Sequence, residues 1–133
     1  MSCLAFLGCG NAEGLVPVSG TVTIDGQPLK MGNIRFVPEK GRPSGGTIDE
    51  NGRYTMTSRV PGDGVSAGTL MVEVTSNTAK GKTVHWLIPQ KYSDYKTSGE
   101  KVTVDGPNDN LDIKLTWKDS GHDAPYDVVM QGE

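Results

Sequence analysis

The chain has 133 residues, a formal net charge of −3 and a pI near 5.3, so it lacks the basic footprint with which proteins bind nucleic-acid backbones. Its length allows one domain with a single core. Only 35% of the residues are hydrophobic, whereas glycine (18) and proline (8) are frequent, which indicates many short strands joined by turns.

The N-terminus is an uncharged, apolar stretch that ends in a cysteine. The box Phe6-Leu7-Gly8-Cys9 resembles the end of a bacterial lipoprotein signal peptide, where the cysteine receives a diacylglyceryl group. Leu7 is larger than the residue usually found there, no Lys or Arg precedes Cys9, and the apolar run is short. A true start upstream of Met1 would explain all three departures.

The resemblance predicts lipid attachment at Cys9, with residues 1–9 as the remnant of a signal peptide and residues 10–15 as a tether. No later window approaches the ~18 apolar residues of a membrane span, so the predicted membrane contact is this anchor. The expected address is the cell envelope or outer surface. Two alternatives remain: ordinary thiols at both cysteines, or a disulfide between Cys3 and Cys9.

Residues 16–24 alternate between apolar and polar side chains, which predicts a half-buried strand. Asp25-Gly26-Gln27-Pro28 ends that strand, because Asp-Gly supplies the positive φ of a tight turn. A second strand is expected at Gly32–Val37, closed by Pro38, which has no N–H to donate.

A loop at 39–46 precedes a predicted hairpin. Asn51-Gly52 lies between β-prone runs and is typical of a hairpin turn, so strands are expected at 47–49 and 53–57. The glycine-rich segment 61–68 is predicted to carry the chain to the other sheet without regular structure.

Four more strands are predicted from alternating apolar residues, at 69–75, 84–88, 102–104 and 111–117. No eleven-residue window has sustained helical spacing, so helix content is expected to be close to nil. Residues 119–133 are mixed and polar, and are expected to trail over the surface.

This spacing of short strands predicts an all-β fold: a two-sheet Greek-key sandwich of seven to eight strands over residues 16–118. Three segments resemble the opening of carboxypeptidase-regulatory-like and transthyretin-like domains: Val18–Leu29, Asn33–Pro38 and Gly45–Tyr54.

Two later regions are similar to a family of small bacterial surface lipoproteins of that fold. They are Pro61–Gly64 with Ala67-Gly68 before Val72–Val74, and Ile88–Asp94 with Thr97–Gly99. The resemblance covers roughly residues 16–117 and implies a prealbumin-like sandwich exported to the cell surface, in a family whose members mostly lack an established activity. The chain departs from it at Tyr95 and Glu100-Lys101, which raises doubt about packing near 95–101.

An enzyme is not expected. The hydrolases of the transthyretin fold use histidines and a C-terminal Tyr-Arg-Gly-Ser, whereas this chain ends in Val129-Met130-Gln131-Gly132-Glu133. Its two histidines are His85, expected on the solvent side of a strand, and His122, expected in the tail. No nucleophile elbow surrounds any serine. A hydrolase that uses His85 is kept as a second alternative.

No metal or other cofactor is expected either. Residues 105–112 are rich in oxygen ligands, but Thr116 stands where an EF-hand needs its glutamate and Pro107 stiffens the loop. An ordinary polar hairpin is the preferred interpretation. The two histidines are too far apart in sequence to indicate zinc.

Ligand binding is the remaining class. Tyr92 and Tyr95 are predicted in a loop beside Trp86, where exposed aromatic rings stack on sugars or on a partner's apolar side chains. In the alternative, Trp86 and Trp117 belong to the core and Tyr92 packs a loop onto an edge. The sequence therefore predicts a non-catalytic, lipid-anchored envelope module that binds protein or glycan, with a carbohydrate-binding module as the first alternative.

Overall fold

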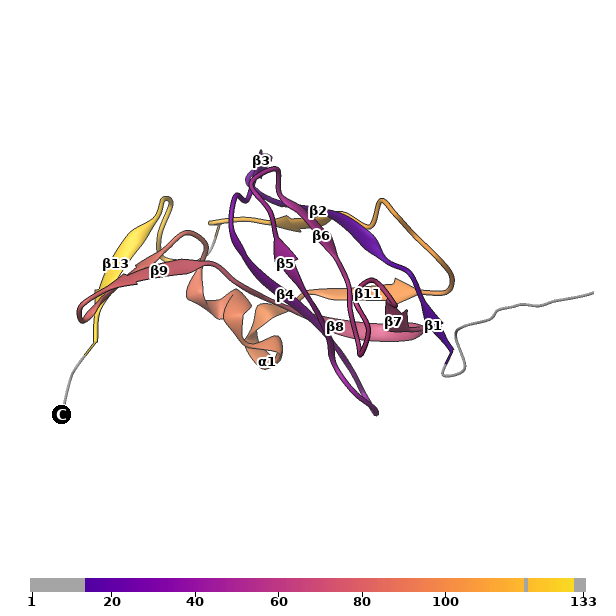
Figure 1. The fold of residues 1–133 in the computed structure, drawn as a ribbon. Helices are drawn as coiled ribbons and strands as arrows, with labels where there is room; N and C mark the ends of the chain where they lie inside the picture. The colour runs from indigo at the N-terminus through magenta and orange to yellow at the C-terminus, as the bar shows by residue number, and fades with distance from the viewer. Residues whose placement is uncertain (1–13, 119, 131–133) are drawn as a thin grey trace, which may run out of the picture.

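The computed structural model describes residues 14–118 and 120–130, which form an all-β sandwich with a small β lobe at one end (Figure 1). Cys9 and the other N-terminal residues lie outside the described part. No helix of the described residues has the length and apolarity to cross a membrane.

The first layer is a four-stranded antiparallel sheet in the order β11-β8-β4-β5. Alternation explains its position, because Ile34 and Phe36 of β4 and Leu70, Val72 and Val74 of β8 are buried, whereas Arg35 and Met71 between them are exposed. Its strands are β4 (Gly32–Pro38), β5 (Ser44–Ile48), β8 (Gly68–Thr75) and β11 (Lys101–Val104).

The second layer is built around β2, which pairs with β12 in parallel and with β3 and β6 in antiparallel orientation. Its strands are β2 (Ser19–Ile24), β3 (Gln27–Pro28), β6 (Arg53–Thr55) and β12 (Ile113–Leu115). A two-stranded pair, β1 (Leu15–Val16) with β7 (Val65–Ser66), lies at the end of the sandwich near the N-terminus (Figure 1).

The core lies between the two layers. Phe36 of β4 and Tyr54 of β6 meet edge to face with ring centres 6.1 Å apart, and each ring is at most 2% exposed. The Tyr54 hydroxyl donates to the carbonyl of Leu111 at 2.5 Å, which ties β6 to the segment before β12. Burial raises the pKa of Tyr54, and the nearby Asp112 carboxylate raises it further.

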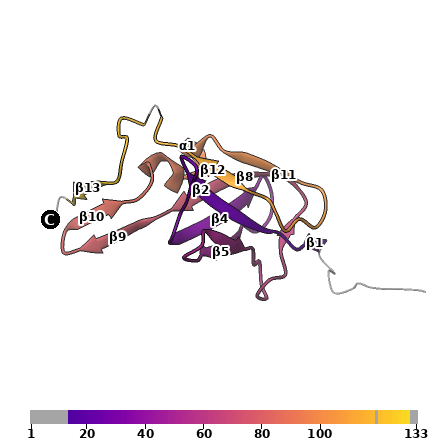
Figure 2. The same cartoon turned by 90° about the horizontal axis from the view of Figure 1, so that it is seen from above.

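The lobe is a three-stranded antiparallel sheet in the order β13-β10-β9 that extends beyond the sandwich in both views (Figures 1 and 2). Its strands are β9 (Asn77–Lys80), β10 (Thr83–Trp86) and β13 (Tyr126–Val129). The tail prediction for 119–133 is therefore wrong for residues 126–129, because β10 offers an open edge to which β13 adds four residue pairs.

Two short helices interrupt the β structure, the 3₁₀ helix η2 (Gln90–Ser93) and α1 (Tyr95–Ser98). The expectation of almost no helix misses these two turns. Asp94 caps α1 by accepting a bond from the Lys96 N–H at 2.8 Å, and Gly99 ends the helix in the left-handed region.

Several predicted strands end where a tertiary contact intervenes. The expected strand 16–24 divides into β1 and β2, because Asn108 bonds to Pro17 and Ser19 between them. The expected strand 111–117 shrinks to β12, since the backbone of Leu111 packs directly on Gly20. An added Cβ on Gly20 would lie 2.0 Å from the Leu111 carbonyl oxygen.

The predictions for the middle of the chain agree better with the structure. The hairpin around Asn51-Gly52 is confirmed, with β5 and β6 on either side. However, β5 begins at Ser44, so the predicted loop 39–46 is too long by three residues. The all-β sandwich is confirmed in the described residues; its Greek-key, prealbumin-like connectivity stays a prediction.

Candidate functional site

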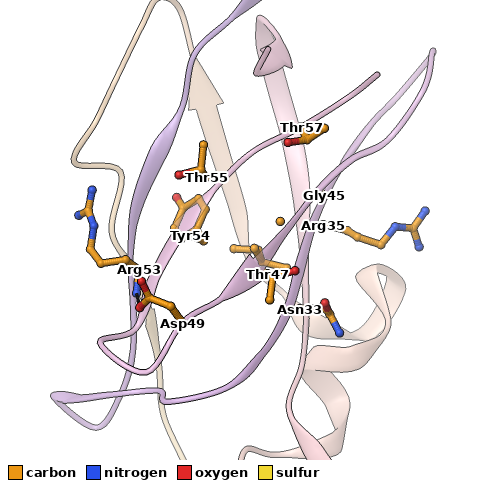
Figure 3. A pocket seen from close by; sticks show the side chains of 11 residues that line it. Asn33, Arg35, Gly45, Thr47, Asp49, Arg53, Tyr54, Thr55 and Thr57 are labelled. Carbon is orange, nitrogen blue, oxygen red and sulfur yellow. Dashed lines mark hydrogen bonds between the residues drawn. The ribbon is translucent and has the colours of Figure 1, made fainter. Parts of the chain in front are cut away.

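A groove crosses the edge of the sandwich at β5, and we call it the β5 groove (Figure 3). It exists because β5 carries Gly45 and Gly46 where its neighbours carry side chains. A Cβ on Gly46 would lie 2.6 Å from the backbone oxygen of Thr55, so only glycine lets the two strands approach this closely. A Cβ on Gly45 would meet nothing closer than 3.5 Å.

The floor of the groove is a gap between β5 and the segment that contains β6. Gly45 and Thr57 exchange both backbone bonds at 2.8–2.9 Å, and the Asp49 N–H donates to the Arg53 carbonyl at 2.9 Å. Between these two contacts, β5 pairs with β4 and β6 pairs with β2, and no strand pairing joins β5 to β6 in the described residues.

The exposed side chains on the walls of the groove carry hydroxyl, amide, carboxylate and guanidinium groups, and the buried Ile34 and Tyr54 lie beneath them. The groove has a volume of about 760 Å³. Its labelled lining residues, which come from β4, β5, β6 and the turns beside them, are Asn33, Arg35, Gly45, Thr47, Asp49, Arg53, Tyr54, Thr55 and Thr57 (Figure 3).

One wall is held rigid by Asp49 and Arg53. The Asp49 carboxylate accepts bonds from the backbone N–H groups of Asn51 (2.8 Å) and Arg53 (2.9 Å). The Arg53 guanidinium reaches across to β2 and donates to the Thr21 hydroxyl at 3.2 Å. It also donates to the Asp109 carbonyl at 3.3 Å. The hairpin wall is thus attached to the second layer by a side chain.

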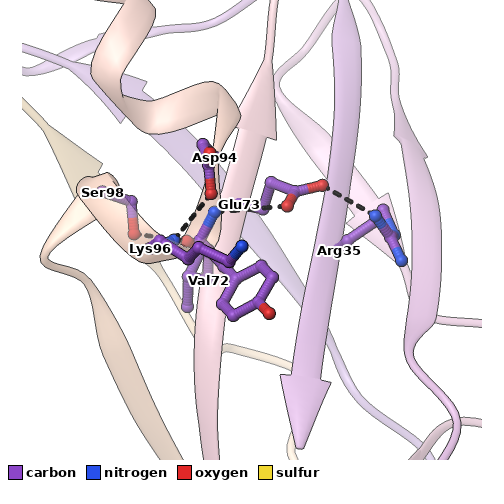
Figure 4. Close-up of polar contacts among 7 residues, drawn as sticks. Arg35, Val72, Glu73, Asp94, Lys96 and Ser98 are labelled. Atoms are coloured by element: carbon purple, nitrogen blue, oxygen red, sulfur yellow. Dashed lines mark hydrogen bonds and ion pairs between the residues drawn. The ribbon is translucent and has the colours of Figure 1, made fainter.

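The opposite wall continues onto the outer face of the first layer (Figure 4). Arg35 of β4 pairs with Glu73 of β8 at 2.9 Å, and their side chains are 50% and 13% exposed. The second Glu73 oxygen accepts from the backbone N–H of Tyr95 at 3.2 Å. A polar row therefore connects the β5 groove to helix α1.

Tyr95 keeps the access that its predicted ligand role requires. Its side chain is half-buried, at the start of α1 rather than in a loop. The Lys96 ammonium lies 5.9 Å from the centre of its ring. Ser98 at the end of α1 donates to the Val72 carbonyl at 2.6 Å, which fixes the helix on β8 (Figure 4).

Tyr92 does not fit its predicted ligand role, because its side chain is only 2% exposed. Its hydroxyl donates to the Thr116 carbonyl at 3.2 Å and accepts from the Thr116 N–H at 3.1 Å. Burial raises the pKa of Tyr92. The alternative role, packing a loop onto the sandwich, is the one that the structure supports. Trp86 and Trp117 are buried, as that alternative predicted.

His85 is partly exposed, and its Nδ1 lies 2.5 Å from Oδ1 of Asp127 in β13. The hydroxyl side chains of Thr78 and Thr83 line the same depression. No described hydroxyl group bonds to His85, however, so the histidine has a carboxylate partner without a bound nucleophile. His122 stacks on Tyr126 with ring centres 3.6 Å apart.

The loop at 105–112 uses its polar side chains on the protein itself. Asn108 accepts from the Asn110 N–H at 2.8 Å, and Asp112 accepts from the Thr21 N–H at 3.2 Å. In the described part of the chain, no three histidine, cysteine, aspartate or glutamate side chains gather where a metal could bind.

No protein-family model matches the chain, and neither a curated protein nor a solved structure is similar to it at a significant level.

The β5 groove was not among the predicted sites. Its signal in the sequence is the pair Gly45-Gly46 followed by Thr47. The two glycines fall within the predicted loop 39–46. Only the pairing of Ser44 with Phe36 places the two glycines on an edge strand, where their missing side chains leave a depression.

Proposed function

We propose that this protein is a non-catalytic module of the cell envelope, attached to a membrane by a lipid on Cys9, that binds a glycan chain in the β5 groove. The transthyretin-like resemblance of residues 16–117 agrees with export and with a binding role. Its prealbumin-like connectivity is part of the same proposal. Nucleic acid, metal and other cofactors have no place in it.

The observation that carries the proposal is the lining of the β5 groove, where hydroxyl and guanidinium donors lie beside carboxylate and amide acceptors. Sugar hydroxyls need both kinds of partner at once. Hot spots for protein partners, by contrast, are usually large aromatic or apolar side chains in pockets. The exposed side chains of this groove are small or polar, so a hydroxyl-rich chain is the better fit than a protein.

Tyr95 extends this surface in the way that the carbohydrate alternative requires. The Tyr95 backbone N–H is bound to Glu73 of the Arg35–Glu73 pair, and its half-buried ring offers a sugar a surface for stacking near groups that hydrogen-bond its hydroxyls. Tyr92 has no part in binding, because it is buried. The ligand surface is therefore the β5 groove together with Tyr95.

Binding to an array of bacterial and plant glycans tests the proposal. Gly45→Val places a side chain in the groove at a position with room for it, so we expect the fold to persist and binding to fall at least about ten-fold. Gly106→Val is the control, because its Cβ would meet nothing within 4 Å and Gly106 is not among the residues that line the groove. Equal binding by both variants, or no glycan bound by the parent chain, contradicts the proposal.

The anchor has its own test, the intact mass of the protein isolated from its native membrane. We expect processing before Cys9 and the added mass of acyl chains. A chain that begins at Met1 with two free thiols contradicts the lipid anchor but leaves the glycan site intact. The hydrolase alternative needs turnover of an acyl or cyclic-amide substrate that His85→Ala abolishes.

A further inference from the structure

The lobe formed by β9, β10 and β13 is amphipathic. Because neighbouring residues of a strand face opposite sides, the pairing register assigns each lobe residue to one of two faces. One face is mainly polar and contains Thr78, Lys80, Thr83, His85 and Asp127, with Val129 beside Thr83. The other face is mainly apolar and contains Ala79, Val84, Trp86, Tyr126 and Val128, with Asn77 beside Trp86.

The sandwich covers only the base of the apolar face. Trp86 is 8% exposed, and Tyr126 packs edge to face against Trp117 with ring centres 6.0 Å apart. Toward the tip, Val84 and Val128 are half-buried and Ala79 is exposed. None of these three residues belongs to the main core cluster, so apolar surface remains open at the end of the lobe.

The tip itself combines exposed apolar side chains with positive charge. Val129 is 61% exposed and Met130 is 55% exposed, two of the few large hydrophobic side chains that face water in the described residues. The Met130 N–H donates to the Lys82 carbonyl at 2.6 Å, which places the end of β13 beside the β9–β10 turn. Lys80 and Lys82 flank that turn at Gly81.

The two lysines have no acidic partner among the described residues. The recorded ion pairs join Arg35 to Glu73 and His85 to Asp127, and neither involves Lys80 or Lys82. The carboxylate nearest in the lobe, that of Asp127, lies on the polar face and is engaged by His85. Among the described residues, the tip therefore presents two unpaired positive charges on a protein whose formal net charge is −3.

The area of the apolar face indicates whether a protein or a lipid surface can bind there. Three strands of four residues cover roughly 200 Å², whereas a stable protein interface needs about 800 Å² on each partner. A second copy of this chain would thus gain too little from this face alone. A lipid surface needs only a few apolar side chains at the level of the headgroups, with lysines above them to meet anionic lipids.

We propose that the tip of the lobe docks end-on onto a membrane surface that contains anionic lipid. The tip has Val84 and Val128 on one face, Val129 and Lys80 on the other, and Met130 and Lys82 at the end. The apolar side chains enter the boundary between headgroups and acyl chains, and the two ammonium groups contact lipid phosphates. This contact is separate from the lipid on Cys9.

The test uses the full chain with Cys3→Ser and Cys9→Ser, which cannot be acylated, so its outcome is independent of the anchor. Its co-sedimentation is measured with vesicles of phosphatidylcholine alone and with 30% phosphatidylglycerol, an amount of order that of bacterial membranes. We expect binding to the anionic vesicles only, weakened by salt. Lys80→Glu/Lys82→Glu should lower the partition coefficient at least about ten-fold, and Val129→Ser/Met130→Ser should lower it several-fold.

Matched controls lie on the sandwich. Lys30→Glu/Lys40→Glu makes the same charge change on exposed lysines outside the three strands of the lobe, and Val60→Ser removes an apolar side chain that is 62% exposed. Both controls should bind as the parent does. Equal loss in the controls, or equal binding to neutral and anionic vesicles, overturns the proposal.

A second readout locates the contact. A polarity-sensitive dye on Met130→Cys, in the same background, should shift to shorter wavelength when anionic vesicles are added, whereas the dye on Val60→Cys should not. If the dye at position 130 shifts with protein concentration in the absence of vesicles, the face binds a second copy and the membrane proposal is wrong.

Discussion

The β5 edge and the lobe both lie at the periphery of the fold, but different interactions stabilise them. Every second residue of β4 is buried in the core, and the groove beside it is held by the Asp49 and Arg53 hydrogen bonds. The lobe contributes no residue of β9 or β13 to that core. A binding groove can thus rest on the rigid part of the molecule, while the lobe depends on pairing within its own small sheet.

The largest expected effect comes from the core beneath the β5 groove. Phe36→Ala removes a fully buried ring that packs on Tyr54, so we expect the free energy of unfolding to fall by about 3–5 kcal/mol. Urea denaturation measures the loss. Val128→Ala in the lobe should cost less than about 1.5 kcal/mol, because that side chain is only half-buried. Similar losses in the two variants would mean that lobe and sandwich share one core.

The two glycines of β5 make a sharper comparison within the groove. Gly46→Ala puts a Cβ 2.6 Å from the Thr55 oxygen, so we expect a destabilisation of roughly 1–3 kcal/mol. Gly45→Ala should be neutral within about 0.5 kcal/mol or slightly stabilising, since its Cβ makes ordinary contacts. Thermal unfolding of both variants checks the difference, and the reverse order would show that the strands do not approach as described.

High pH should weaken the sandwich through Tyr54. Burial raises the pKa of this phenol above its usual value near 10, so the folded protein favours the protonated form. The resulting stability is complete below pH 10 and is lost as the pH rises above it. Tyr54→Phe should lose about 1 kcal/mol at neutral pH with its bond to Leu111, but should decline less above pH 10. If the free energies of unfolding of the parent chain and of Tyr54→Phe fell equally above pH 10, this role of Tyr54 would be contradicted.

Removing the last strand should matter less to the sandwich than any of these changes. A chain that stops after Pro125 loses β13, which is joined to the rest by pairing with β10 and by the contacts of Tyr126 and Asp127. We expect the cooperative unfolding of the sandwich to shift by about 1 kcal/mol or less, while amides of β10 exchange faster with deuterium. Complete unfolding of the truncated chain would make the lobe part of the main cooperative unit.

The smallest effect is expected at Asp63, in the loop that leads to β7. Its carboxylate accepts backbone bonds from Ser58, Val60 and Arg59, and the Ser58 bond is the main cause of its lowered pKa. The stability from this cap is present above the unfolded pKa near 4 and is lost as the pH falls below it. Asp63→Asn should remove that acid dependence, measured as loop amide exchange between about pH 5 and 3. If Asp63→Asn left the pH dependence of loop amide exchange unchanged, the Asp63 carboxylate would not stabilise the loop.

The alternating patterns of the chain predicted the sandwich, because period-two burial is a local property that each strand carries in its own residues. The inward rows of β2, β4 and β8 are buried as predicted, and Asn51-Gly52 makes the turn that its chemistry requires. Those parts of the fold need no knowledge of their partners.

What depends on partners was left open by the sequence or was missed. The sequence offered two roles for Tyr92, ligand contact and loop packing, and its bonds to Thr116, 24 positions away, show that it packs. The strand at 126–129 was not predicted, and it forms because β10 has a free edge. The β5 groove likewise depends on the distance between Gly46 and Thr55. The sequence alone determined which residues alternate and where turns fall, since both are short-range. Tertiary structure decided which strand edges pair and which remain unpaired. Hydrogen bonding between distant segments produces no periodic pattern in the sequence of either segment.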